Sequence, residues 1–201
     1  MLGKCFNLMI GDFGFATNIR NEEGEILLTG KYGTPQYMAP EVSYGAPYSG
    51  TAADVFSCGV ILFLLVTVSF PFSIAIKITD PLYRKIVQKD YKSFWESVEK
   101  SSKKKFSGEF KDLINSMLAF DPRERATIQK IKDHPWFKGH ILDAEDLQKT
   151  ISNLKEKVDA IRVEYRLREK EEAAKAKALA KESQEEELKA PLAFAGVHPK
   201  M

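Results

Sequence analysis

Cysteine is scarce in this chain, and neither sign of charge dominates. Cys5 and Cys58 are the two cysteines among 201 residues, and they form neither a disulfide framework nor a metal-ligand spacing. The formal net charge of +2 gives no reason to expect a nucleic-acid partner. The N-terminus lacks a basic segment followed by a long apolar run, so no secretory signal is visible. We therefore expect a reducing, cytoplasmic location.

Charged residues are absent from one long stretch, residues 55–76. Its length would allow it to span a bilayer, so a membrane anchor is one hypothesis for this chain. Against that hypothesis, Pro71 would break the helix near its end, and no girdle of aromatic and basic residues flanks the stretch. A helix that is apolar on all sides is usually surrounded by other elements. We favour such a buried core helix, capped by Ser49 and ending near Val68.

The rest of the first 138 residues has the pattern of a mainly α-helical domain. Alternating apolar residues predict one short strand over 6–10, and polar turn formers such as Asn21 predict a loop over 15–32. One or two helical turns, anchored by Trp95, are expected between residues 81 and 98.

Two further helices are predicted from their caps. Ser107 can cap a helix with one apolar face, and Asp121-Pro122 would end it. Thr127 can cap a short last helix. The apolar face of the first of these helices consists of Phe110, Leu113, Ile114, Met117 and Leu118.

Beyond Gly139 the composition changes. Apolar residues recur at alternating spacings of four and three, the a and d pattern of heptads, until Arg168 interrupts it. From residue 166 to 189 the chain is rich in charged residues and alanine, which have strong helix propensity and predict a solvated helix. The heptads predict either a short coiled coil or an amphipathic helix that packs on the domain. The heptad positions are Leu147, Ile151, Leu154, Val158, Ile161 and Tyr165.

Two motifs carry the strongest functional signal. Gly11-Asp12-Phe13-Gly14 places a lone carboxylate between glycines after the predicted strand. Residues 33–41 read Gly-Thr-Pro-Gln-Tyr-Met-Ala-Pro-Glu, a loop that ends in Pro-Glu. In protein kinases, Asp-Phe-Gly and Ala-Pro-Glu bracket the activation loop in this order. The tripeptide alone is weak evidence, but the combination is long and therefore specific.

The chain resembles the C-terminal lobe of a eukaryotic serine/threonine protein kinase domain, of the calcium/calmodulin-dependent-like branch. The resemblance covers residues 1–138 and implies a protein-kinase-like fold truncated to most of that lobe, with a short strand remnant followed by helices. Residues 139–190 would form a helical tail, and residues 191–201 a disordered terminus. The family transfers a phosphoryl group from ATP, bound with Mg²⁺, to serine or threonine of a protein substrate.

The resemblance gives roles to residues of the activation segment, which we define as residues 12–41. Asp12 would bind the Mg²⁺ that bridges the nucleotide phosphates, because this hard cation prefers oxygen ligands. Gly33, Thr34 and Pro35 would dock the substrate hydroxyl, with Thr34 hydrogen-bonded to the catalytic loop.

Three further residues would be structural in such a lobe. Glu41 would form a buried ion pair with Arg125 and so tie the activation segment to the lobe. Loss of one partner of such a pair typically costs ~3–5 kcal/mol. Asp54 would hold the backbone of the catalytic loop by hydrogen bonds, and it lacks that partner if the loop is not in the chain.

The resemblance also suggests where the activation segment is phosphorylated. The usual position lies three residues before Gly33, and glycine occupies it here as Gly30. Thr29, one residue earlier, is the preferred candidate, and Tyr32 and Thr17 are weaker candidates.

Several parts that catalyse phosphoryl transfer do not occur in the 201 residues. These are the Gly-rich loop, the strand lysine, its helix glutamate and the His-Arg-Asp catalytic loop. We therefore expect that this chain is a truncation of a longer kinase, and that alone it neither binds ATP tightly nor catalyses. The apolar helix over 55–68 should also be partly uncovered, because the helix that normally packs beside it precedes the matched region.

Two alternatives to an enzyme fragment stay open. One is a non-catalytic binding or scaffold module that dimerises through a coiled-coil tail, and the other is the membrane anchor over 55–76. A protein substrate is the expected partner of the parent enzyme. The tail, through residues 147–165, would either self-associate or pack on the lobe, and we rank both above calmodulin binding.

Overall fold

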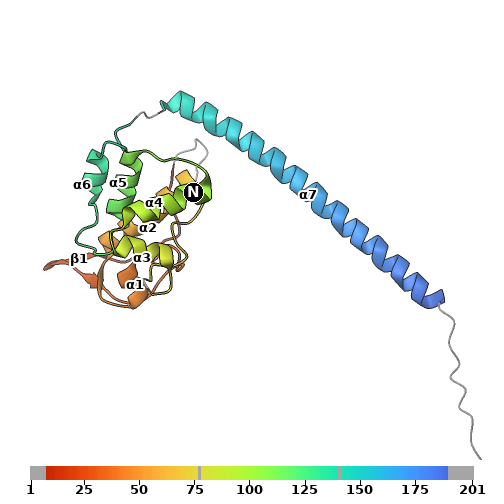
Figure 1. Cartoon of the computed structure of the whole chain (residues 1–201), viewed down its shortest axis with the longest axis horizontal. Coiled ribbons are helices and arrows are strands. Elements are labelled where there is room, and N and C mark those ends of the chain that lie inside the picture. The colour runs from red at the N-terminus through yellow and green to blue at the C-terminus, as the bar shows by residue number, and fades with distance from the viewer. Residues whose placement is uncertain (1–7, 77, 140–141, 190–201) are drawn as a thin grey trace, which may run out of the picture. The chain divides into compact units, whose positions relative to one another are not determined.

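The computed structural model describes residues 8–76, 78–139 and 142–189, with side chains as far as residue 177. Its contacts separate into two units, which are described one at a time. Residues 10–141 form a compact unit of helices and short strands, and the long helix α7 belongs to the other unit (Figure 1). The expected fold class, mainly helical with small strands, is confirmed. The predicted disordered terminus, residues 191–201, lies outside the described residues.

Two pairs of very short antiparallel strands begin the compact unit. Strand β1 (Arg20–Asn21) pairs with β2 (Gly24–Glu25), and β3 (Leu27–Leu28) pairs with β4 (Tyr48–Ser49). The prediction of a continuous loop over 15–32 is therefore wrong in part, because strands of two residues are too short to show an alternating pattern. Asn21 does form a turn as predicted, since its Oδ1 accepts a hydrogen bond from the backbone N–H of Glu23 at 3.0 Å.

The strand predicted over 6–10 does not form in the part of it that the structure describes. Leu8 makes a single bridge, whereas Met9 and Ile10 have no regular structure. Leu8 and Ile10 are 83% and 85% exposed. Alternation indicates a strand only where one face is buried, and that condition is not met here. Residues 6 and 7 lie outside the described residues.

Helix α2 (Gly50–Thr67) carries the core of the compact unit. The short helix α1 (Pro40–Tyr44) precedes it in the chain. Ser49 caps α2 as predicted, because its Oγ accepts a hydrogen bond from the backbone N–H of Ala52 at 3.4 Å. The helix ends where predicted, at Val68 in the left-handed conformation. Phe56, Val60 and Phe63 of this helix are fully buried.

The prediction that α2 is buried on all sides is wrong. Residues at spacings of three and four form an exposed stripe along the helix, in which Leu65 is 74% exposed and Val68, at the C-cap, is 79% exposed. No other element of the described chain covers this side, so the expectation of a partly uncovered apolar face is confirmed. The stripe consists of Thr51, Asp54, Cys58, Ile61, Leu65 and Val68.

Helix α2 is also the one helix of the described residues that is long and apolar enough to cross a membrane, and 44% of it is buried. Length and composition alone are weak evidence for a membrane span, because the core helix of a soluble domain passes the same test. The burial of Phe56, Val60 and Phe63 among other side chains is the property of such a core helix.

Two complete helices, rather than one or two turns, lie between residues 81 and 102. Helix α3 (Pro81–Val87) and helix α4 (Tyr91–Ser102) are capped by aspartates that the sequence reading overlooked. Asp80 accepts hydrogen bonds from the backbone N–H groups of Leu82 and Tyr83, both at 2.9 Å. Trp95 of α4 is buried as predicted.

Helices α5 (Gly108–Met117) and α6 (Ile128–Asp133) begin after the predicted caps, Ser107 and Thr127. Helix α5 ends at Met117, before the predicted stop at Asp121-Pro122, and its apolar face packs against α2. The contact requires Gly59, since a Cβ there would lie 2.9 Å from the Cβ of Met117.

Helix α7 (Ala144–Lys189) is continuous over 46 residues. The backbone N–H of Asp146 donates to the Oδ1 of Asp143 at 2.8 Å, which satisfies one of the free groups at the helix start. Arg168 interrupts the heptads but not the helix, and its ion pair with Glu164 at 2.7 Å supports the helical turn. The helical tail is thus confirmed up to Lys189, while the domain boundaries at 138 and 190 remain predictions.

Candidate functional site

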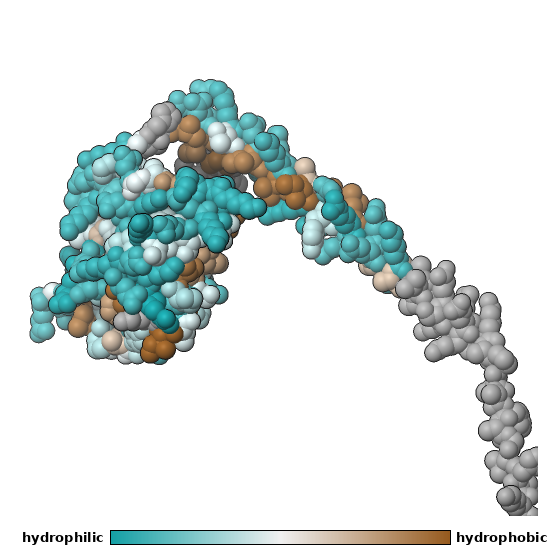
Figure 2. Space-filling model, viewed as in Figure 1, coloured by the Kyte–Doolittle hydropathy of each residue, from teal (hydrophilic) through white to brown (hydrophobic). Residues whose placement is uncertain are grey.

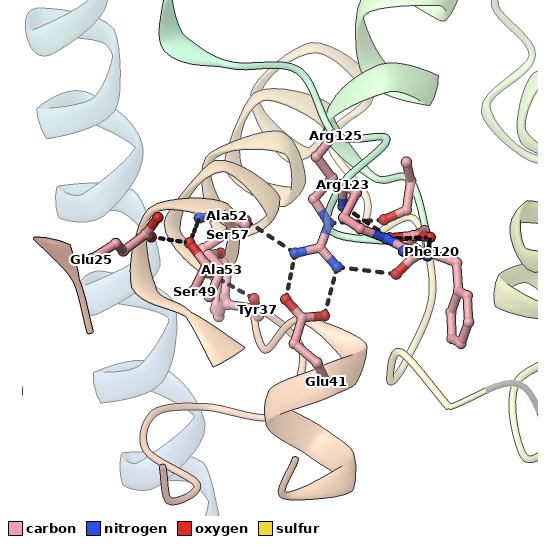
Figure 3. Close-up of polar contacts among 12 residues, drawn as sticks. Glu25, Tyr37, Glu41, Ser49, Ala52, Ala53, Ser57, Phe120, Arg123 and Arg125 are labelled. Carbon is pink, nitrogen blue, oxygen red and sulfur yellow. Dashed lines mark hydrogen bonds and ion pairs between the residues drawn. The ribbon is translucent and has the colours of Figure 1, made fainter. Parts of the chain in front are cut away.

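Arg125 and Glu41 form a bidentate ion pair in the compact unit (Figure 3). Both guanidinium-to-carboxylate distances are 2.6 Å, and Arg125 is 4% exposed. The pair joins α1 to the loop before α6 across 84 positions of sequence. The contact expected between these two residues is therefore present.

Every N–H donor of the Arg125 guanidinium has a partner. Beyond its two bonds to Glu41, it donates to the backbone carbonyls of Ala119 at 2.8 Å, Ala52 at 3.0 Å and Phe120 at 3.3 Å. Arginine has five such donors in a planar fork, and the five bonds use all of them. Because a buried charge is tolerated only when it is paired and hydrogen-bonded, this arrangement fixes the end of the activation segment to α2 and to the loop after α5.

Aromatic side chains complete the surroundings of the ion pair. The guanidinium of Arg125 lies over the ring of Phe56 at 4.9 Å, and Phe56 contacts Tyr83. Burial raises the pKa of Tyr83 well above its usual range. Its hydroxyl has no hydrogen-bond partner among the described residues.

The predicted docking loop is held to α2 by its own backbone. Thr34 and Pro35 accept hydrogen bonds from the N–H groups of Tyr37 at 3.0 Å and Met38 at 3.3 Å. The hydroxyl of Ser57 in α2 donates to the carbonyl of Tyr37 at 2.9 Å (Figure 3). The loop thus forms a turn whose exposed side carries Gly33, Thr34 and Pro35, where a peptide could reach the Thr34 hydroxyl.

Asp12 is exposed and has an uncommon backbone conformation. Its φ is 64°, in the left-handed region that few residues other than glycine adopt. The Oδ1 accepts a loose hydrogen bond from the N–H of Gly14 at 3.4 Å, and the Oδ2 accepts none from the described residues. No hydrogen bond in the described chain joins Asp12 to the docking loop.

Asp12 by itself offers one carboxylate ligand for a Mg²⁺ ion and does not form a complete metal site. The described residues contain no group of three or more histidine, cysteine, aspartate or glutamate side chains that could hold a metal. Mg²⁺ is commonly held by one or two carboxylates together with substrate phosphates and water. A single exposed carboxylate therefore fits the predicted role only if the nucleotide supplies the other oxygens.

Asp54 lies in the first turns of α2, on its exposed side. Partial burial raises the pKa of its carboxyl, and no described residue donates a hydrogen bond to it. A hydrogen-bond donor would stabilise the charged form of such a carboxylate and lower its pKa again. The structural role of Asp54 remains a prediction.

The three candidate phosphorylation sites are all exposed. Thr17, Thr29 and Tyr32 lie on the surface of the activation segment, and the ring of Tyr32 packs on Phe15 at 5.7 Å. Gly30 has a φ of 103°, and a Cβ there would lie 2.6 Å from the Tyr32 ring. A serine or threonine at this position would therefore be strained in this conformation.

The sequence reading missed how the activation segment attaches to the start of α2. The hydroxyl of Ser49 donates to the Oε1 of Glu25 at 2.5 Å, and β3 pairs with β4 directly beside it. A Cβ on Gly50 would lie 2.8 Å from Ile19 and 3.0 Å from Leu28. Ser49 was recognised as a cap, but a cap signal is local and does not identify a partner 24 residues away.

A helical lobe whose activation segment is tied down by a buried arginine–glutamate pair is the arrangement expected of a protein kinase. The family described as Protein kinase domain matches residues 1–137. The chain therefore belongs to the protein kinase family and contains part of its catalytic domain.

Curated relatives make the class more specific. The chain is 43% identical over 134 residues to CBL-interacting serine/threonine-protein kinase 24 of Arabidopsis thaliana, which covers 66% of this chain and 27% of that protein. It is 36% identical over 158 residues to CBL-interacting protein kinase 11 of Oryza sativa subsp. japonica, with 76% and 28% covered. It is 39% identical over 135 residues to the serine/threonine-protein kinase GIN4 of Saccharomyces cerevisiae, with 67% and 11% covered.

These matches confirm the predicted serine/threonine kinase family. They also show that the chain spans less than a third of the length of the curated relatives named here.

Proposed function

We propose that residues 1–137 are the activation segment and helical lobe of a kinase that transfers the γ-phosphoryl group of ATP to serine or threonine of a protein. The observation that carries the proposal is the Glu41–Arg125 pair, because it holds the Pro-Glu end of the segment to the lobe with five hydrogen bonds from Arg125. Phosphoryl transfer depends mainly on positioning and on charge stabilisation. A fixed segment is therefore a requirement of the chemistry.

Each predicted site residue has a role in this proposal. ATP with Mg²⁺, when bound, supplies the phosphoryl group, and the carboxylate of Asp12 would be a ligand of that ion. The exposed turn at Gly33, Thr34 and Pro35 would receive the peptide that carries the acceptor hydroxyl. A phosphate on Thr29 would add charge at the surface of the segment, next to Gly30, which cannot itself be modified.

We further propose that the 201 residues alone are catalytically incomplete. The sequence contains no Gly-rich loop, and Asp12 is a single carboxylate with no further metal-ligating group among the described residues. A titration of the purified chain with ATP and Mg²⁺, followed by calorimetry, should show no binding at micromolar nucleotide. Micromolar affinity together with turnover of a peptide substrate would contradict this proposal.

A chimera tests whether this lobe supports phosphoryl transfer once the parts missing from the chain are supplied. Residues 1–137 would replace the matching region of the Arabidopsis relative, with which the chain shares 43% identity. We expect the chimera to phosphorylate serine or threonine peptides, and the change Asp12→Asn in it to abolish turnover with little effect on folding. An inactive but folded chimera, with the unaltered relative active in the same assay, would overturn the assignment.

The exposed apolar stripe of α7 favours a second candidate function, a non-catalytic binding module. In that case the lobe would be a scaffold without catalytic activity, and the helical tail would bind the partner. Thr34→Ala in the chimera, which lacks α7, tests the first function alone, because it should slow peptide phosphorylation if the docking turn is used. The second function is tested on the full chain, by whether partner binding depends on the stripe of α7. On cysteine usage alone, we propose a cytoplasmic location for either function.

A further inference from the structure

The first part of α7 exposes one continuous apolar stripe. Side chains at alternating spacings of three and four point along one side of the helix, as the brown band on α7 in Figure 2 shows. Leu154 is 54% exposed and Ile161 is 64% exposed, whereas Ile151 near the start of the stripe is half-buried. Its members are Leu147, Ile151, Leu154, Val158, Ile161 and Tyr165.

The heptad register follows from these spacings. Ile151, Val158 and Tyr165 occupy a positions, and Leu147, Leu154 and Ile161 occupy d positions. β-Branched residues at a with leucine at d favour pairing with one other helix. Four of the six positions follow this rule, and the exceptions are Tyr165 at a and Ile161 at d.

The charges beside the stripe oppose pairing with a second copy in parallel orientation. In such a pair, a g residue lies beside the e residue of the next heptad on the partner helix. Lys157 would then lie beside Arg162 of the other copy, and Glu164 would lie beside Glu169. Both contacts join like charges.

An antiparallel self-pair has the same difficulty. When all six apolar positions overlap, Lys155 of one copy lies beside Lys155 of the other, and Lys157 beside Lys157. A shift that brings Lys155 opposite Glu169 places Val158 against Arg168 and removes most of the apolar overlap. Self-association thus requires either like-charge contacts or loss of apolar burial.

The flanking charges instead match a different partner. Lys155, Lys157 and Arg162 surround the middle of the stripe, and no described residue forms an ion pair with either lysine. Arg162 makes one exposed contact with Asp159 at 3.6 Å. Acidic residues on a partner beside these three side chains would form attractive contacts with them, whereas Glu164 would need a neutral or basic neighbour.

We propose that α7 docks an amphipathic helix of another protein through residues 147–165, and that this partner carries acidic side chains beside its apolar stripe. The charges beside the stripe favour this partner over a second copy of the chain. This inference goes beyond phosphoryl transfer and does not depend on it.

Two synthetic peptides test the proposal against the full 201-residue chain. The native probe is residues 144–172, and the acidic probe is the same peptide with Lys155→Glu, Lys157→Glu and Arg162→Glu. Fluorescence anisotropy of labelled probe should show the acidic probe binding at least about tenfold tighter than the native probe at low salt. The difference should narrow in about 0.5 M salt, because exposed charges are then screened.

Matched variants of the chain separate the stripe from the rest of the helix. Val158→Gln, on the stripe, should abolish binding of the acidic probe. Val163→Gln, an equally large change of a 57% exposed valine that lies off the stripe, should leave it intact. The triple change Lys155→Glu, Lys157→Glu and Arg162→Glu in the chain should reverse the preference towards the native probe.

Three outcomes would overturn the proposal. Equal affinity for both probes would show that charge does not select the partner. A dimer of the chain that Val158→Gln dissociates in sedimentation would identify a second copy as the occupant. Absence of binding to either probe, with α7 helical by circular dichroism, would show that the stripe is not available for docking.

Discussion

At the scale of single residues, Arg125 makes more connections than any other side chain described here. It joins the end of the activation segment, the first turn of α2 and the loop after α5 through one guanidinium group. A lysine could not replace it, because an ammonium lacks the planar fork that binds both oxygens of Glu41.

The change Glu41→Ala should therefore strongly destabilise the fold. It leaves the Arg125 guanidinium buried without its counter-charge, which typically costs ~3–5 kcal/mol. The free energy of unfolding from urea titration measures this effect. As a control, Lys89→Ala removes the exposed pair of Lys89 with Glu124 at 2.8 Å and should change stability by less than ~1 kcal/mol. Similar effects of the two changes would contradict the structural role given to Arg125.

Glu99 predicts how stability depends on pH. Hydrogen bonds from Lys105 and then Lys111, both at 2.6 Å, lower the pKa of this carboxyl from 4.5 to about 2. Because the pKa is lower in the folded than in the unfolded chain, the stabilisation is present above pH 4.5 and is lost as the pH falls towards 2.

The variant Glu99→Gln should then have a flatter profile of melting temperature against pH between these two values. Thermal melts of both proteins from pH 7 down to pH 2 measure it. If the two profiles are parallel over the acid range, the ion pairs of Glu99 do not contribute in the way described.

At the scale of elements, the contact between α2 and α5 depends on the absence of a side chain at Gly59. A Cβ there would lie 2.9 Å from Met117 and 3.0 Å from Leu118, closer than side chains normally approach. Alanine raises helix propensity by roughly 1 kcal/mol over glycine, so propensity and packing oppose each other at this position.

We expect packing to dominate, so that Gly59→Ala destabilises the protein by ~1–3 kcal/mol. Gly108→Ala is the matched control, because it lies in α5 with nothing within 4 Å of its Cβ position, and it should be neutral or stabilising. Urea titrations of the two variants give opposite signs if the packing is as described. A stabilising effect at both positions would mean that α5 can move away from α2 at little cost.

The starts of the helices show where a local sequence signal is sufficient to predict an element. Ser49, Ser107 and Thr127 were identified as helix caps because a cap needs one side chain and a backbone N–H within the next turn. The apolar face of α5 was found from its period. By contrast, α3 and α4 were underestimated, although Asp80 and Asp90 carry the same kind of cap signal, because their apolar residues are interleaved with charged ones.

At the scale of the whole molecule, burial differs greatly between the two units. Phe56, Val60 and Phe63 of α2 are fully buried, whereas all side chains of α7 from residue 153 to 177 are exposed. Local opening is controlled by buried apolar contacts. The backbone of α7 should therefore open more easily than that of α2.

Hydrogen exchange measured by mass spectrometry tests this difference. Amides of residues 153–177 should exchange much faster than those of residues 56–63, under conditions in which the chain is folded. Binding of the acidic probe described above should slow exchange in the first of these ranges and leave the second unchanged. Equally slow exchange in both ranges without any probe would show that α7 is covered by something else.

The amino-acid sequence by itself determined the family, the order of the motifs, the main helices and the heptads of the tail. Each of these depends on residues that are neighbours in the chain, such as Asp12-Phe13-Gly14 or a cap and its helix. The resemblance also pointed to the Glu41–Arg125 pair, which no local pattern contains.

Only the tertiary structure decided which groups meet across long distances and which faces stay exposed. Ser57 donates a hydrogen bond to the carbonyl of Tyr37, and Ser49 donates one to Glu25. Leu65, an apolar residue of the core helix α2, is exposed. The physical reason is that a hydrogen bond or a buried surface depends on where the whole chain places its parts, whereas propensity and capping depend on one turn at a time.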